Sequence, residues 1–490
     1  MNVHNPIGLR IRHVARAAPD RVAVDDANGA LSYAALYELA TRYAGAFRSV
    51  SREGRVLLAL PQGADAYAAQ LGCYLAGRTY CPVDNSLPES RLRAIVDTFH
   101  PDIICIDSAT TWTTGIRTLS PGESRSTEPS SSIETAADIA YVIFTSGSTG
   151  RPKGVLIRTR SLSPFFDWLR DAFAPGPEDR WAQFSRLGFD LSIVDILGAL
   201  LSGSTLVPVV KAADRLLPGR FIDRERITIW HSVPSLIPAI VEQAPKHSHT
   251  LKSLRLASFC GEPLYEHHVA ILFSRCADLR LFNTYGPTEG TLFCTFQEFT
   301  CQSYKTACHG SAAIGRPIPG WQVLLAPNGS PAVDQTFEMI IAGDNIGAGY
   351  LGASAAEDAR FTTVQTPIGP KPAFLTGDQI RVIESNWYFA GRLDSQVKIR
   401  GHRLELGEIE ATLMQLGVTE AHAFVHQGRL IAAVRGIDKH NDVTLRQLTR
   451  QHLPDHAVPS QILLVDSFPR LSSGKVNYAE LVTLLSGGDS

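Results

Sequence analysis

Short apolar runs alternate with longer amphipathic stretches along this chain, and this alternation restricts its possible folds more than any other feature. Runs with the length and composition of buried strands lie at residues 56–60, Ile103–Ile106, 139–144, 205–210 and 227–230. Apolar residues at helical spacing lie between them, as in Ala64–Ala76 and residues 88–99. This rhythm indicates βαβ units and a mostly parallel sheet covered by helices. We therefore predict an α/β fold.

The chain is long enough to form more than one hydrophobic core. It has 490 residues, of which 44% are apolar, whereas a single core stops growing near about 250–300 residues. The apolar pattern restarts after residues 391–394. We predict a large, multi-subdomain α/β unit over residues 1–393 and a small α+β unit over residues 394–490, joined by a hinge. Residues 120–135 and 367–372 are polar or proline-rich and are predicted to be loops.

Charge and cysteine content exclude several classes of protein. The 46 basic and 48 acidic side chains give a net charge of −2, so no overall field attracts nucleic acid or an acidic membrane. Eight scattered cysteines without a C-x-x-C pair indicate reduced thiols. We find neither a signal-length apolar run at the start nor the roughly 18–20 apolar residues of a membrane span. A cytoplasmic protein is expected.

The strongest local signal is the segment YVIFTSGSTGRPKGV at residues 141–155. Small residues after a strand allow backbone N–H groups and hydroxyls to converge on one anion, and a lysine adds positive charge. The segment does not match the P-loop pattern of kinases and GTPases. A Gly/Ser surface turn is the alternative to a phosphate-binding loop. The predicted phosphate ligands are Thr145, Ser146, Gly147, Ser148, Thr149, Gly150 and Lys153.

This loop resembles the phosphate-binding signature of the adenylate-forming superfamily, which includes acyl-CoA synthetases, luciferases and adenylation domains of nonribosomal peptide synthetases. Further signatures follow in the family's order from about residue 31 to residue 475. The resemblance to a stand-alone amino-acid adenylation domain implies a ligase that uses ATP and Mg²⁺ to form an aminoacyl-AMP. It also implies transfer to the phosphopantetheine thiol of a separate carrier protein, and it allows an MbtH-like helper protein as a further partner.

Two motifs resemble the nucleotide-binding segments of that family. In NTYGPTEGT, the resemblance implies that Tyr285 flanks the adenine, Thr288 touches the α-phosphate and Glu289 binds Mg²⁺ through carboxylate oxygens. In LTGDQIRV, it implies that Asp378 accepts both ribose hydroxyls, assisted by Arg392. A proline-containing turn and a solvated loop aspartate are the respective alternatives.

The last hundred residues resemble the mobile part of the family. Within YFAGRLDSQVKIRGHRLELGEIE, Asp394 matches the hinge and Gly401 the path of the pantetheine arm. Within PRLSSGKVNYAEL, Lys475 matches the catalytic lysine, which contacts the substrate carboxylate and the α-phosphate region. The resemblance implies that the small unit swings about Asp394 and withdraws Lys475 between the two half-reactions. An exposed charged hairpin before a helix from Leu406, and a solvent-facing lysine, are the alternatives.

The segment LGFDLSIVDILGALLSGSTLV indicates which carboxylate is activated. Asp190 stands where amino-acid-activating members place the partner of the substrate α-ammonium group, and a buried carboxylate is costly without a cation. The alternative is an N-cap for a helix over residues 192–201. A small or medium uncharged amino acid is predicted, with serine-like or threonine-like side chains favoured because His231 can donate or accept a hydrogen bond. The family's pocket positions correspond to Phe189, Asp190, Leu191, Val194, His231, Ser258, Cys260, Gly261, Thr284, Leu292, Phe293 and Lys475.

Two other functions stay open at this level. An acyl-CoA synthetase would release its product with free coenzyme A and would tolerate Asp190→Ala. A nonenzymatic member would bind nucleotide only as a scaffold, although the presence of both Glu289 and Lys475 favours an enzyme.

Overall fold

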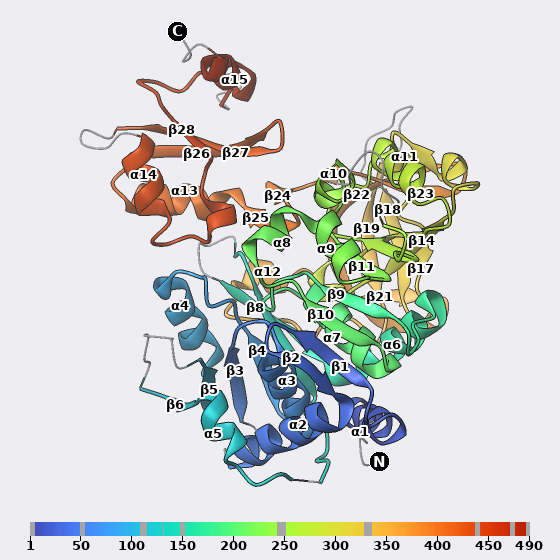
Figure 1. Ribbon diagram of the computed structural model, residues 1–490. Coiled ribbons are helices and arrows are strands. Elements are labelled where there is room, and N and C mark those ends of the chain that lie inside the picture. Colours follow the sequence, from blue (N-terminus) through green and yellow to red (C-terminus); the bar gives the residue numbers. More distant parts are fainter. Residues whose placement is uncertain are drawn as a thin grey trace.

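The chain folds into a large unit and a small unit, seen here in a computed structural model. The structure describes residues 5–49, 54–107, 115–130, 132–147, 152–242, 251–327, 336–436, 442–470 and 476–486. The large unit ends with strand β23 (Asn386–Arg392), and the small unit begins with strand β24 (Gln396–Ile399). Figure 1 shows the small unit, labelled β24 to α15, on one side of the large one. The predicted α/β fold with a small C-terminal part is confirmed.

One mixed sheet of the large unit has nine strands within the described residues. Its central strands from β13 to β1 run parallel, whereas the pairs at both edges are antiparallel. The order is β17 (Arg316–Pro317), β14 (Thr295–Phe299), β13 (Arg280–Tyr285), β12 (Leu256–Phe259), β11 (Ile229–Ser232), β9 (Arg180–Gln183), β10 (Thr205–Pro208), β1 (Val22–Asp26) and β2 (Gly29–Ser32).

A second sheet has seven strands in the part of the chain that the structure describes. Strands β7, β4, β3, β5 and β6 are parallel, and β8 and β20 join antiparallel at one edge. The order is β20 (Tyr350–Leu351), β8 (Lys153–Arg158), β7 (Ile139–Thr145), β4 (Thr79–Pro82), β3 (Arg55–Ala59), β5 (Ile103–Ile106) and β6 (Arg117–Leu119).

Both sheets are packed on their two faces, which explains the continuous apolar runs in the sequence. In β3, Val56 and Leu58 face a core shared by the two sheets, whereas Leu57 and Ala59 face a core under α4 (Glu89–Phe99). The large unit is therefore a layered α/β structure with helices between and outside its sheets. The shared core holds α1 (Pro6–Ala17), α2 (Tyr33–Arg48), α3 (Ala64–Ala76), α6 (Thr159–Phe173) and α7 (Leu191–Ser202), and the outer face of the nine-stranded sheet is covered by α9 (Pro218–Arg224), α10 (Ile237–Glu242) and α11 (Glu266–Arg275).

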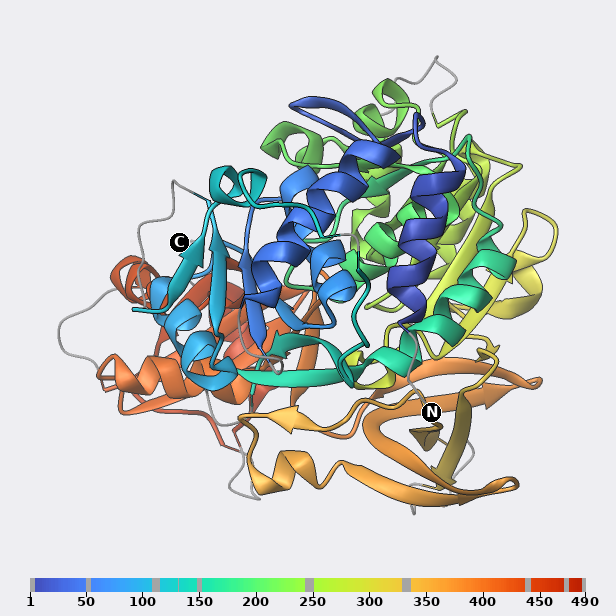
Figure 2. The ribbon, with the colours of Figure 1, turned by 90° about the horizontal axis from the view of Figure 1, so that it is seen from below.

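A third sheet connects the large unit to the small one, and Figure 2 shows it in gold and orange beside the layered part. Its long strand β22 pairs antiparallel with β23, so that Asp378 lies opposite Arg392. This pairing brings two of the predicted nucleotide ligands together. The strands are β18 (Gln322–Pro327), β19 (Thr336–Ala342), β22 (Gly369–Ile383), β21 (Phe361–Thr366) and β23.

The small unit has its own hydrophobic cores. Neither core cluster includes a described residue before Val397. One face of its three-stranded sheet packs against α13 and α14, and the other face packs against α15. The position of the division at residue 394 stays a prediction. The elements are β24, β25 (His402–Glu405), α13 (Leu406–Gln415), β26 (Glu420–His426), β27 (Arg429–Arg435), α14 (Asp442–Thr449), β28 (Gln461–Leu464) and α15 (Tyr478–Ser486).

Two segments predicted to be loops contain regular structure, so those predictions were wrong in part. Residues 120–135 include the short helix α5 (Pro121–Arg125), which a capping box between Ser120 and Glu123 begins. Residues 369–372 belong to β22 despite two prolines, because this end of the strand lies beyond its partner β19 and pairs with β21.

No described helix has the length and apolar character required to cross a bilayer. The N-terminal segment forms α1, whose buried residues include Ile7, Ile11 and Ala15. All eight cysteines lie in described residues, and none is joined to another.

Close packing between α7 and β9 gives a test of the core. A Cβ atom on Gly198 would lie 2.7 Å from Cη2 of the fully buried Trp181. We expect Gly198→Ala to lower stability by about 1–3 kcal/mol through overpacking, measured as a lower midpoint of thermal unfolding. Gly176→Ala is the matched control, because a Cβ there has no neighbour within 4 Å. Equal midpoints for both variants would contradict this packing.

Candidate functional site

Polar side chains gather where the parallel strands β11, β12 and β13 end, which is where open α/β sheets bind ligands. His231 lies opposite Ser258 in the register of β11 and β12. The hydroxyl oxygens of Ser258 and Thr284 lie 3.5 Å apart, and Thr284 also donates to the carbonyl of Phe259 at 3.1 Å. Three pocket residues predicted from the sequence are thus brought together on one sheet edge.

Asp190 lies beside this edge, at the start of α7. It has helical dihedral angles, φ −61° and ψ −29°, and its side chain makes no capping hydrogen bond to the second or third residue of the helix. Burial raises the pKa of Asp190 above its usual value, while Thr288 and the backbone N–H of Leu191 oppose this shift. The helix therefore does not need this carboxylate as an N-cap, and the capping alternative loses support.

Several residues of the predicted pocket are apolar or aromatic. Phe293 packs edge to face against His231, with ring centroids 5.3 Å apart. Phe189 makes a similar contact with His402 of the small unit at 4.7 Å. Burial raises the pKa of the Cys260 thiol to about 11, so Cys260 is a neutral wall residue. The buried wall residues are Val194, Cys260, Leu292 and Phe293, and Leu191 is half-buried.

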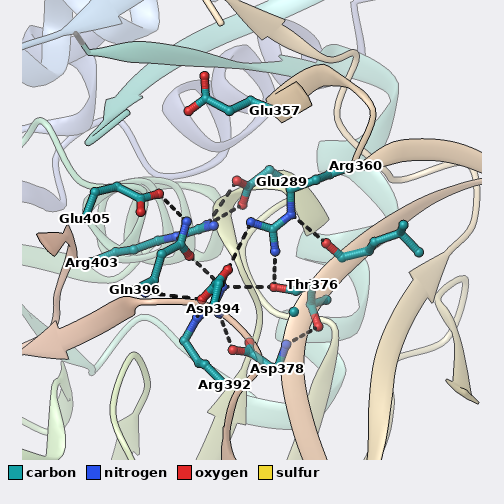
Figure 3. A network of polar contacts seen from close by, with 12 residues as sticks. Glu289, Glu357, Arg360, Thr376, Asp378, Arg392, Asp394, Gln396, Arg403 and Glu405 are labelled. Atoms are coloured by element: carbon teal, nitrogen blue, oxygen red, sulfur yellow. Dashed lines mark hydrogen bonds and ion pairs between the residues drawn. The ribbon is translucent and has the colours of Figure 1, made fainter. Parts of the chain in front are cut away.

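Glu289 is the centre of a buried charge network (Figure 3). Its carboxylate is fully buried and receives the Arg403 guanidinium at 3.0 Å on both oxygens. The Tyr350 hydroxyl donates to the same carboxylate. Burial alone would raise the pKa of Glu289, but Arg403 and Tyr350 outweigh it and hold the pKa below its usual value. The buried Glu289 carboxylate is therefore paired with a cation from the small unit.

A second cluster surrounds Asp378, which is 1% exposed. The Tyr285 hydroxyl donates to it at 2.5 Å, and Arg392 forms an ion pair with it. Arg392 also binds Asp394 at 2.7 Å and, against the effect of burial, lowers the pKa of Asp394. The structure thus places the predicted adenine residue, the two predicted ribose residues and the predicted hinge residue in one contact network.

The two clusters are joined across the boundary between the units. Gln396 accepts from Arg392 at 2.6 Å and from Arg403 at 2.8 Å (Figure 3). A chain of hydrogen bonds therefore runs from Asp378 to Glu289. Any reorientation of the small unit must break it at one of these contacts.

The predicted phosphate loop is only partly described. Ser146 follows β7 and donates from its hydroxyl to the carbonyl of Arg403 at 2.9 Å. The Thr145 hydroxyl is buried and has no hydrogen-bond partner among the described residues. Gly147 ends the described part of the loop, and Ser148, Thr149 and Gly150 lie outside it.

Lys153 begins β8 and is 2% exposed. Its ammonium group pairs with Glu357 at 3.0 Å and lies 4.6 Å from the centre of the Tyr350 ring. Because Tyr350 also donates to Glu289, Lys153 contacts the Glu289 network through the Tyr350 ring. Its charge is matched by Glu357 rather than aimed into the loop.

The hairpin β24–β25 of the small unit contacts Glu262, Val233 and Tyr285 of the large unit. The Gly401 N–H donates to Glu262 at 2.6 Å. Gly401 has φ +79°, and a Cβ there would lie 2.2 Å from Val233, so glycine is required for this contact. Lys398 places its ammonium group 5.7 Å from the centre of the Tyr285 ring. Gly401, the residue predicted to line the path of the pantetheine arm, thus contacts Glu262 and Val233 of the large unit.

Lys475 lies outside the described residues. Arg470 and Val476 on either side of it pair with each other, and the Asn477 N–H donates to Pro469 at 2.8 Å. Figure 1 shows α15, which follows directly, at the end of the small unit farthest from the large one.

Two stacked histidines add a titratable contact at the boundary. The rings of His402 and His456 lie 3.6 Å apart and nearly parallel, against Phe189 of the large unit. Burial, with Arg186 nearby, lowers the pKa of His402 to about 4. Burial, with His402 nearby, lowers that of His456 to about 3. Both rings are neutral in this arrangement near pH 7.

Sequence reasoning missed three residues of the site. Arg403 lies within a matched motif but was given no role, although it is the cation on Glu289. Tyr350 was not singled out, and only its contact with Glu289 reveals it. Asp195 has the pattern of a core helix residue, and its contact with His231 at 3.1 Å appears only in the folded chain.

Comparison with known proteins gives consistent matches over most of the chain. The family model described as AMP-binding enzyme matches residues 11–351. An L-proline–[L-prolyl-carrier protein] ligase of Pseudomonas fluorescens is 32% identical over 98% of this chain and 99% of its own. A D-alanine–D-alanyl carrier protein ligase of Bacillus velezensis is 30% identical over 95% of this chain and 97% of its own. The crystal structure of the Vibrio cholerae adenylation domain AlmE with glycyl-adenosine-5'-phosphate has the same fold, with a TM-score of 0.85, 23% identity, and 99% and 98% coverage.

The histidine stack predicts a pH-dependent arrangement of the two units. Solvent exposure would return both pKa values toward about 6.5, so a separated arrangement takes up protons more readily. Closure is therefore favoured above pH 6.5 and weakens as pH falls from 6.5 toward 4. We expect small-angle X-ray scattering to show a larger radius of gyration at pH 5 than at pH 7.5.

His456→Phe keeps the ring stack and removes one titrating group, so it should reduce this pH dependence. His452→Phe, at an exposed position of the same unit, is the control. Identical scattering at both pH values in the native protein would contradict the prediction.

Proposed function

Because this chain belongs to the family of AMP-binding enzymes, we propose that it adenylates an uncharged α-amino acid with ATP and transfers the aminoacyl group to a carrier-protein thiol. The observation that carries the proposal is the carboxylate of Asp190, which does not cap α7 and whose pKa is raised by burial. An ionised carboxylate removed from water needs a cationic partner, and the α-ammonium group of an amino acid supplies one. Relatives named as proline and D-alanine carrier-protein ligases support the same class.

In the first half-reaction, a substrate carboxylate oxygen bonds to the α-phosphorus of ATP, and the bond to pyrophosphate breaks. Two anions meet in this step, so the protein must align and neutralise them. We assign the adenine to Tyr285, the ribose to Asp378 with Arg392, and the phosphates to Thr145, Ser146 and the following loop. Thr288 would contact the α-phosphate, and Lys475 would stabilise the pentavalent centre.

Glu289 is the residue that fits a magnesium ion. It is a fully buried carboxylate whose environment requires a cation, here the Arg403 guanidinium. Hard divalent cations prefer such oxygen ligands beside phosphates. When bound, Mg²⁺ would draw charge away from the leaving pyrophosphate. In the present arrangement the Arg403 guanidinium already neutralises the Glu289 carboxylate. We therefore propose that this arrangement belongs to the stage after pyrophosphate has left.

In the second half-reaction, the thiol sulfur bonds to the carbonyl carbon of the adenylate, AMP leaves, and the thiol proton passes to solvent. This step needs the Gly401 hairpin at the pocket and Lys475 withdrawn from it. The contact of Gly401 with Glu262 and the outward position of α15 support that assignment. Asp394 would be the hinge, since its contacts with Arg392 lie between the two units.

The partners follow from this chemistry. A separate phosphopantetheinylated carrier protein would deliver the thiol, and an MbtH-like helper stays a proposed accessory protein. An acyl-CoA synthetase has less support, because Asp190 would have no cationic group to bind in a fatty or aromatic acid.

Pyrophosphate exchange with a panel of amino acids tests the first half-reaction. We expect at least one amino acid to drive exchange of labelled pyrophosphate into ATP. Asp190→Ala should lower that rate by about 10²-fold or more, as lost charge-assisted hydrogen bonds do, and Lys475→Ala by about 10²–10³-fold. Asp171→Ala removes an exposed carboxylate and is the control. Full amino-acid-driven exchange by Asp190→Ala would contradict the role assigned to Asp190, and exchange driven only by a fatty or aromatic acid would favour the acyl-CoA synthetase.

Arg403→Gln tests the second half-reaction. Without this cation Glu289 stays buried and unpaired in the present arrangement. Removal of one partner of a buried ion pair lowers the stability of that arrangement by about 3–5 kcal/mol. Loading of a carrier should therefore fall at least tenfold more than pyrophosphate exchange. Arg400→Gln makes the same charge change at an exposed position of the same hairpin. A parallel fall in both reactions would exclude a role specific to thiol transfer.

A further inference from the structure

A cavity lies between three helices of the large unit, outside the site described above. The helices α1, α6 and α7 pack against one another on the side of the large unit away from the small unit (Figure 1). The cavity between them has a volume of about 670 Å³, and cavities of about 300–1,000 Å³ are the usual size of small-molecule sites. Ser202 in its lining follows Asp190 by about 18 Å along the axis of α7. The cavity is therefore separate from the predicted amino-acid pocket.

The floor of this cavity is apolar. Phe166 and Leu169 of α6 are 3% and 2% exposed, and Leu197 of α7 is 1% exposed. Leu9 of α1 belongs to the same lining and is 39% exposed, so apolar surface of the cavity is in contact with water. Covering that surface with an apolar ligand is favourable.

The charged side chains around this floor are all basic. Arg10, Arg12, Arg16 and Arg170 line the cavity together with His13, and no carboxylate of the described residues lines it. The whole chain has a net charge of −2, so this gathering of positive charge is local. A ligand of the cavity is therefore expected to carry negative charge.

Two of the four arginines have no ion-pair partner in the part of the chain that the structure describes. Arg10 and Arg170 both pair with Asp167, at 2.6 and 3.4 Å. Arg12 and Arg16 form no such pair with any described residue. They stand four residues apart on α1, a spacing at which like charges repel each other. An anion bound by both guanidinium groups would remove this repulsion.

The combination of charge and apolar floor selects a class of ligand. Guanidinium groups bind carboxylates and phosphates through paired, charge-assisted hydrogen bonds. A small inorganic anion would leave the floor in contact with water, whereas a neutral apolar molecule would leave Arg12 and Arg16 without a counter-charge. A molecule with an anionic head and an apolar chain satisfies both parts of the cavity.

We propose that the cavity between α1, α6 and α7 is a second binding site, which takes an organic anion with an apolar chain. Arg12 and Arg16 bind the anionic head, and Phe166, Leu169 and Leu197 contact the chain. The inference does not rest on the proposed ligase function, because none of these residues takes part in it.

Ligands that differ in one feature test the site on the native protein. Isothermal titration calorimetry would compare decanoate with decanamide, which lacks the charge, with decylammonium, which reverses it, and with acetate, which lacks the chain. All would be used below the concentrations at which they form micelles. We expect saturable binding of decanoate, about tenfold or more tighter than that of decanamide or decylammonium, and no saturable binding of acetate. Decyl phosphate in place of decanoate would show which anionic head binds more tightly.

A double variant locates the bound anion. Arg12→Ala with Arg16→Ala should raise the Kd of decanoate about tenfold or more, because both unpaired cations are removed. Arg220→Ala with Arg275→Ala is the matched control, since it removes two exposed arginines of α9 and α11, on the outer face of the nine-stranded sheet. The control should leave the Kd unchanged, and thermal unfolding would verify that both variants are folded.

Either of two results would overturn the inference. Equal binding of decanoate and decanamide would show that the arginines do not recognise the head. An unchanged Kd in the Arg12 and Arg16 variant would show that decanoate binds elsewhere, for example in the predicted substrate pocket. Both results would leave the proposed ligase function intact.

Discussion

The contact on which the site depends is the ion pair between Glu289 and Arg403, one residue from each unit. A fully buried carboxylate cannot remain ionised without a partner, and burial alone would raise its pKa. The large unit supplies Tyr350 as a hydrogen-bond donor, but its Lys153, whose charge also acts on Glu289, is paired with Glu357. The positive charge that neutralises the Glu289 carboxylate must therefore come from a metal ion or from the small unit. This requirement links the position of the small unit to the contents of the nucleotide site.

A chain of hydrogen bonds extends from this ion pair to Asp378 and Asp394. Gln396 joins Arg403 to Arg392, and Arg392 joins Asp378 to Asp394. The residue that would bind ribose and the residue that would act as hinge thus share one guanidinium. A change at either end therefore alters the partners available at the other.

Much of this arrangement was predictable from local sequence. The apolar runs gave the parallel strands, because sheets covered on both faces need continuous apolar strands. The motifs correctly grouped Tyr285, Asp378 and Arg392, since strand pairing fixes where such residues meet. The loop predictions at residues 120–135 and 367–372 were wrong in part, because a capping box and an edge strand overrode composition.

The rest could not be predicted, because it depends on contacts between distant segments. Lys153 follows the phosphate loop in sequence, yet its charge is taken by Glu357, some two hundred residues later. Asp195 occupies an ordinary helix position, and only its distance to His231 distinguishes it. Arg403 has no local signal for its role, because the packing of the two units decides which residue reaches Glu289.

Hydrogen exchange of the hairpin formed by β24 and β25 tests the central claim most directly. The native protein would be measured with Mg²⁺ and a nonhydrolysable ATP analogue, and then with a nonhydrolysable aminoacyl-adenylate analogue without Mg²⁺. If Glu289 exchanges a metal ion for Arg403, the hairpin amides are protected in the second state and exchange faster in the first. Equal protection in both states would show that the metal ion and Arg403 do not compete for this carboxylate.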